Sequence, residues 1–103
     1  MEKLITVYWR DIPAQVMGRR GRRTAVKKAL DPRFQEAIDR AAMRAGRGSS
    51  DAYLADWRRE SQAADGELEH AVDARVAALE AAFPPDRLER VVRAGGVARE
   101  DET

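Results

Sequence analysis

The sequence predicts a small α+β domain, with a short antiparallel sheet packed by two main helices and followed by a short C-terminal helix. Residues 3–9 alternate in side-chain direction and are rich in β-branched and aromatic types, which is typical of a strand. Two later segments repeat apolar residues every three to four positions, which is typical of amphipathic helices. With 103 residues, the chain forms one domain that buries roughly two thirds of the surface of its unfolded form.

The strand over residues 3–9 is expected to be central, because both of its faces are apolar. Pro13 has no N–H to donate to a ladder, so the strand should end shortly before it. A second extended segment is expected over residues 14–20. Gly18 and Gly21 indicate a bulge or a turn between antiparallel strands.

The first main helix should begin at Pro32 and run to about Ala45. Asp31 can accept the unpaired N–H groups of the first turn, and proline at the first helical position loses no hydrogen bond. Gly46 and Gly48 then indicate the end of the helix.

The second main helix is predicted over residues 65–83, and the prolines at 84–85 should stop it. Its apolar stripe consists of Leu68, Val72, Val76, Leu79 and Phe83. A short third helix over residues 86–94 should close at the two glycines at 95–96.

Residues 49–59 leave two alternatives open. Ser49, Ser50 and Asp51 either cap a helix or form a turn before a short strand, and we favour the strand because the first strand needs neighbours. The aromatic and basic side chains of this segment could form a surface for stacking on a base or a ligand ring, although such aromatics more often lie in the core. These side chains are Tyr53, Trp57, Arg58 and Arg59.

The inventory of reactive groups is small. The absence of cysteine excludes disulfides, a thiolate nucleophile and zinc sites built on sulfur. His70, the one histidine, has Asp73 one helical turn away, but no third ligand stands at a suggestive spacing, so a solvated helix face is the better interpretation. We therefore expect no metal, no cofactor and no catalytic residue.

No segment of about 18 apolar residues and no signal-peptide pattern is present. We therefore expect a cytoplasmic protein that does not associate with membranes. Residues 1–95 should form the single domain, and the acidic tail over residues 96–103 should be disordered.

Charge is strongly segregated along the chain. Residues 1–33 carry +6 and the remainder carries −5, so the net charge of +1 conceals a dipolar sequence. The segment over residues 17–28 holds six cations and no acid, namely Arg19, Arg20, Arg22, Arg23, Lys27 and Lys28. Such a segment attracts phosphate groups or an acidic protein face, or else it neutralises the acidic side of the helix over residues 65–83.

A second candidate site is the end of the first strand. Arg10 and Asp11, followed by Pro13, could present an ion pair beside a cleft, since strand ends often carry sites. The alternative is an ordinary surface pair followed by a turn.

Several segments resemble the bacterial virulence factor domain family, which is also similar to the C-terminal portion of conserved virulence factor C type proteins. The resemblance covers roughly residues 3–82, and it is carried by ITVYWRDIPAQV (5–16), GRRGR (18–22), RFQEAIDRAAM (33–43) and DAYLADWR (51–58). It implies a small cytosolic domain without an established catalytic activity or catalytic residues to carry over. It also implies, in alphaproteobacteria, an association with genes of folate and corrinoid one-carbon metabolism.

These observations together predict a non-enzymatic accessory or interaction protein. It would contact an acidic protein partner through the Arg-rich segment and the corner over residues 9–13, and the resemblance suggests one-carbon enzymes as partners. The alternative is a nucleic-acid-binding protein that uses the same basic segment.

Overall fold

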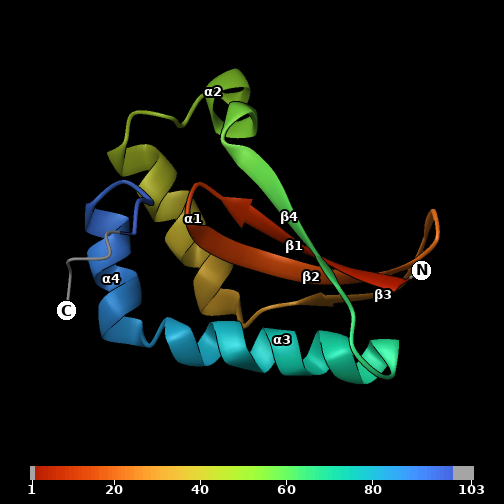
Figure 1. The fold of residues 1–103 in the computed structure, drawn as a ribbon. Coiled ribbons are helices and arrows are strands. Elements are labelled where there is room, and N and C mark those ends of the chain that lie inside the picture. The colour runs from red at the N-terminus through yellow and green to blue at the C-terminus, as the bar shows by residue number, and fades with distance from the viewer. Residues whose placement is uncertain (1, 99–103) are drawn as a thin grey trace.

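A computed structural model describes residues 2–98 and confirms the α+β class. One four-stranded antiparallel sheet has the order β3-β2-β1-β4, with β1 (Glu2–Trp9), β2 (Ile12–Arg20), β3 (Arg23–Ala29) and β4 (Trp57–Ala63). The helices are α1 (Pro32–Arg44), α2 (Ser50–Ala55), α3 (Leu68–Ala82) and α4 (Pro85–Arg93). In Figure 1, α3 runs along the sheet, α1 and α4 lie beside one another, and α2 stands at the start of β4.

The strand predicted over residues 3–9 is central, as expected, because β1 pairs with β2 on one side and with β4 on the other. Its helix-facing residue Leu4 belongs to the main core together with Val16 and the buried residues of α1, α3 and α4. Gly18 on β2 is needed here, because a Cβ at this position would lie 2.8 Å from Leu68 Cγ of α3. The close approach of α3 therefore explains one of the glycines in the basic segment.

The other side of the sheet, which we call the open face, has its own small apolar cluster of Ile5, Val7 and Met17, with Trp57 packed against it. Among residues 2–98, no helix residue belongs to this cluster. From the strand registers, the open face comprises Lys3, Ile5 and Val7 of β1, Gln15, Met17 and Arg19 of β2, Thr24, Lys27 and Ala29 of β3, and Trp57, Arg59, Ser61 and Ala63 of β4.

The preferred alternative for residues 49–59, a turn followed by a short strand, is wrong for Ser50–Ala55, which form α2. Ser49 caps this helix, since its side chain accepts a hydrogen bond from Ala52 N. The strand does exist, but it begins at Trp57 and extends to Ala63. Both alternatives therefore hold in part, because a six-residue helix leads directly into the edge strand.

Asp31 caps α1 as predicted, and its Oδ1 accepts from Arg33 N at 3.0 Å. The helix α3 begins at Leu68 rather than at residue 65, because Gly66 has a φ of +72° and breaks the helical path. The strand over residues 23–29 lacks an apolar alternation, so the sequence indicated only the turn before it.

The C-terminal tail expected from residue 96 is attached to the domain over its first part. Gly96 lies against Trp9 and accepts a backbone hydrogen bond from Asp11 N at 2.9 Å. Ala98 N donates to Asp11 Oδ2 at 2.8 Å. The predicted disorder of the tail concerns residues that mostly lie outside the described part of the chain.

Candidate functional site

The turn between β1 and β2 holds Arg10 in an unusual conformation, with a φ of 52°. A non-glycine residue in this region is disfavoured by about 1–2 kcal/mol and needs compensating contacts. Both backbone groups of Arg10 supply them, because its N–H donates to Asp56 O at 3.0 Å and its carbonyl accepts from Arg58 Nε at 2.7 Å. The start of β4 thus fixes this turn.

The side chain of Arg10 joins three separate segments. Its Nε donates to Asp56 Oδ2 at 3.2 Å and its Nη1 donates to Gly95 O at 2.9 Å, while the guanidinium lies 5.2 Å from the ring centroid of Trp9. Arg47 Nε binds the same Asp56 oxygen at 2.9 Å. Asp56 therefore neutralises two arginines at the junction of the turn, α2 and the C-terminal segment.

Burial alone would raise the pKa of Asp56, but the hydrogen bonds from Arg47 and Arg10 outweigh it and hold that pKa below its usual value. A carboxylate with a lowered folded-state pKa stabilises the fold above its unfolded pKa. This contribution is lost as the pH falls through the folded pKa.

We predict that Asp56→Asn lowers the free energy of unfolding by about 1–2 kcal/mol at pH 7. The difference from the wild type should disappear as the pH falls from about 4 through the lowered pKa. Urea denaturation followed by circular dichroism at a series of pH values measures both effects. Asp65→Asn at an exposed position is the control, and a similar loss of stability in that variant would contradict the role of Asp56.

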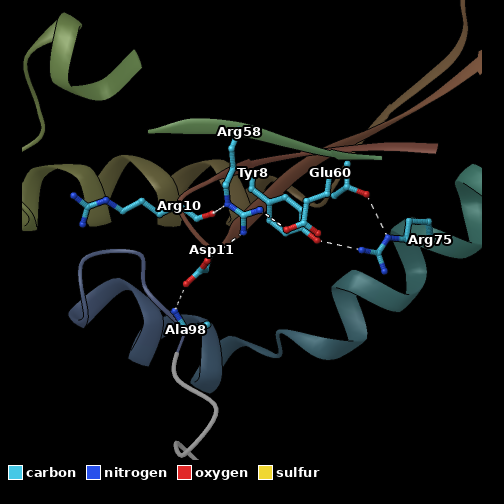
Figure 2. A network of polar contacts seen from close by, with 8 residues as sticks. Tyr8, Arg10, Asp11, Arg58, Glu60, Arg75 and Ala98 are labelled. Carbon is cyan, nitrogen blue, oxygen red and sulfur yellow. Dashed lines mark hydrogen bonds and ion pairs between the residues drawn. The ribbon is translucent and has the colours of Figure 1, made fainter. Parts of the chain in front are cut away.

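Asp11 is held by a second network, which Figure 2 shows. Its Oδ1 accepts from Arg58 Nη2 at 3.2 Å, and Arg58 also pairs with Glu60. The guanidinium of Arg58 lies 4.4 Å from the ring centroid of Tyr8. From α3, Arg75 Nη2 donates to the Tyr8 hydroxyl at 3.1 Å.

Arg10 and Asp11 therefore have different partners, Asp56 and Arg58, and the predicted ion pair between the two is replaced by these longer-range contacts. The charges of Arg10 and Asp11 are thus both neutralised by residues of the same domain. The contacts of Arg10 and Asp11 join the turn, α2, β4 and the C-terminal segment. The role that these contacts support is therefore structural.

The four arginines of the basic segment gather at the connection between β2 and β3, which we call the hairpin tip (Arg19, Arg20, Arg22 and Arg23). Gly21 makes the turn with a φ of +64°. Because β2 runs from Ile12 to Arg20, the hairpin tip and the Arg10–Asp11 corner lie at opposite ends of the same strand. The structure therefore separates the two candidate sites.

The partners within the hairpin tip are few and exposed. Arg20 Nε contacts Glu2 Oε2 at 2.7 Å, and Arg19 Nη2 donates to Arg22 O at 2.8 Å. Within residues 2–98, no carboxylate lies within 4.0 Å of a charged nitrogen of Arg19, Arg22 or Arg23.

The two lysines of the segment point to opposite sides of β3. Lys28 Nζ contacts Asp73 Oδ1 of α3 at 3.0 Å, so the predicted neutralisation of the acidic helix is realised by this residue. Lys27 pairs with Met17 in the register and lies on the open face. Internal neutralisation therefore accounts for only part of the basic segment.

The remaining candidate residues from the sequence are the aromatic and basic side chains around β4 and the histidine of α3. Tyr53 and Trp57 are half-buried, Tyr53 stacks on Trp9 with ring centroids 6.0 Å apart, and Arg59 is exposed. His70 is exposed on α3, while Asp73 is bound to Lys28. In the described part of the chain, no three His, Cys, Asp or Glu side chains are grouped so as to hold a metal ion.

Sequence reasoning missed the residues that complete the corner, namely Arg47, Asp56 and Arg75. Asp56 and Arg75 bind residues of the first strand and its turn from 46 and 67 positions away, and the contact of Arg10 with Gly95 spans 85 residues. The two adjacent glycines at 95–96 were a signal, since both have positive φ and the second packs against Trp9. From the sequence alone, they indicate only the end of a helix.

The fold and these surfaces define a small α+β domain that combines an internally matched polar corner with a cationic sheet surface. None of the helices in residues 2–98 is both long enough and apolar enough to cross a membrane. The chain matches the model of the family described as Virulence factor over residues 7–92, and it belongs to that family. No curated protein and no solved structure matches it significantly.

Proposed function

We propose that this domain is a non-enzymatic interaction module of the cytoplasm that binds an acidic protein surface through its hairpin tip. The observation that carries the proposal is the clustering of four arginines on an exposed turn. Among the described residues, only one of the four, Arg20, is paired with a carboxylate, that of Glu2. The exposed pair of Arg20 with Glu2 contributes at most about 1 kcal/mol, so it can be exchanged for a partner's carboxylates.

Several features favour an acidic protein over nucleic acid. The net charge of the chain is only +1, and Lys28 is already engaged with Asp73 on α3. The class of partner that the family resemblance suggests is the enzymes of folate and corrinoid one-carbon metabolism.

The test is an affinity capture with the tagged full chain from a nuclease-treated bacterial lysate. The wild type is compared with a variant in which Arg19, Arg20, Arg22 and Arg23 are changed to Glu, and with a matched variant in which they are changed to Lys. We expect defined proteins to be retained by the wild type, weakened at high salt, kept largely by the Lys variant and lost by the Glu variant.

Retention of the same proteins by the Glu variant would contradict the proposal. Nucleic-acid binding is tested in parallel with a labelled DNA duplex and a single-stranded RNA at about 50 mM salt. If the DNA or the RNA binds with nanomolar affinity, and this affinity falls steeply with salt concentration, the partner is a nucleic acid and not an acidic protein.

A further inference from the structure

The open face of the sheet carries a hollow of about 350 Å³ beside its apolar cluster. The hollow is lined by Val7, Gln15, Trp57, Arg58 and Arg59. It lies within the size range of ligand pockets, which is about 300–1,000 Å³. The guanidinium of Arg58 is turned toward Tyr8 and Asp11, so the charged group free to meet a ligand here is that of Arg59.

The lining of the hollow combines apolar side chains with the polar Gln15 and the cationic Arg59. Val7 is buried and Trp57 half-buried, and both contribute hydrocarbon surface. Ile5 and Met17 continue the apolar surface along the sheet under the longer side chains. An apolar side chain of a ligand would therefore find hydrocarbon contacts in the hollow.

The charge of the open face has a single sign. Lys3, Arg19, Lys27 and Arg59 lie on it, and within the four strands no carboxylate does. The strand acids Glu2 and Glu60 lie on the helix-facing side, where they pair with Arg20 and Arg58. A second copy of this chain would bring like charges together, so self-association through this face is disfavoured.

We infer that the open face binds an acidic polypeptide segment that inserts one large apolar side chain into the hollow while its carboxylates meet the surrounding cations. The inference rests on the proposed function and deepens it, because Arg19 belongs both to the hairpin tip and to the open face. The hairpin tip then attracts the acidic partner, and the hollow selects segments that carry an apolar anchor.

A nucleic acid fits this face less well. Only one aromatic side chain, Trp57, lines the hollow, and its ring already meets Tyr53 edge-on, with centroids 5.8 Å apart. Gln15 is the one uncharged polar side chain of the lining, whereas Val7 offers no hydrogen bond to a base edge. The apolar floor is better matched by a Phe or Leu side chain.

The test uses two synthetic peptides, one with a single Phe among Glu residues and one with Ala in place of that Phe. Isothermal titration calorimetry measures their affinity for the full-length protein. We expect the Phe peptide to bind about tenfold more tightly than the Ala peptide, which corresponds to burial of much of one aromatic side chain.

Two matched variants locate the anchor. Gln15→Phe places a ring into the hollow from β2, and it should abolish the preference for the Phe peptide while leaving the Ala peptide bound. Thr24→Phe adds the same ring to the open face at the far end of β3, opposite Arg19 and outside the lining of the hollow, and it should retain the preference.

The outcomes separate the inference from the proposed function. Equal affinity of the wild type for both peptides, or a preference that survives Gln15→Phe, overturns the hollow as the anchor site. In that case the proposed function stands if the Ala peptide binds the wild type but does not bind the variant in which the four hairpin-tip arginines are changed to Glu. Failure of both peptides to bind, or tighter binding of an oligo-uridine of equal length, contradicts both. If Gln15→Phe does not fold, the comparison of the two peptides on the wild type decides.

Discussion

Replacing Trp9 by alanine should lower the free energy of unfolding by about 3–5 kcal/mol. Trp9 is fully buried, its Nε1 donates to Tyr53 O at 2.9 Å, and its ring stacks on Tyr53. It is also in contact with Gly96, so its loss opens a cavity between β1, α2 and the C-terminal segment. Because small domains have about 5–15 kcal/mol of stability in total, this loss removes a large share of the stability of the domain.

Urea denaturation followed by circular dichroism measures this effect without depending on tryptophan fluorescence. Met43→Ala is the control, since Met43 is 77% exposed and should change the free energy of unfolding by less than about 0.5 kcal/mol. A loss of under about 1 kcal/mol in Trp9→Ala would contradict the packing around the β1–β2 corner.

The second large effect is expected for Gly96→Ala, which should lower the free energy of unfolding by about 2–4 kcal/mol. Gly96 has a φ of +95°, and an added Cβ would lie 2.8 Å from Trp9 Cζ3. Backbone strain and a clash with a fully buried ring therefore act together. Thermal unfolding monitored by circular dichroism provides the measurement.

Gly21→Ala separates these two causes. Gly21 also has a positive φ of +64°, but an added Cβ would meet nothing within 4 Å. It should therefore show only the cost of the backbone conformation, about 1–2 kcal/mol. Equal losses in the two variants would mean that Trp9 does not press on Gly96.

The elements that could be predicted are those whose signal is local. The apolar alternation of residues 3–9 predicted β1, Asp31 and Pro32 predicted the start of α1, and the apolar stripe predicted most of α3. The strand β3 gave no such signal because it is an exposed edge strand that has charged residues on both of its faces. The segment at 49–59 was ambiguous because a short helix and a strand follow one another there.

The candidate sites could be predicted only as clusters of charge. The basic segment is visible in the sequence, but the positions of Arg19, Lys27 and Arg59 on one face depend on strand register. Likewise, the pairing of Arg10 with Asp56 depends on the meeting of segments 46 residues apart. Such contacts follow from the tertiary fold. The sequence therefore predicts either a site or an ordinary surface pair at Arg10 and Asp11, whereas in the structure Arg10 pairs with Asp56 and Asp11 with Arg58.

A titration of the ¹⁵N-labelled protein with the Phe peptide, followed by two-dimensional NMR, tests whether the open face and its hollow bind an acidic segment with an apolar anchor. The Trp57 indole N–H reports on the hollow, because Trp57 is part of its lining. We expect the Trp57 indole and the backbone amides of Val7, Gln15 and Arg59 to shift, with the backbone amides of α4, which packs in the main core, unchanged. Shifts confined to α1 and α4, or no shift at saturating peptide, would contradict the claim.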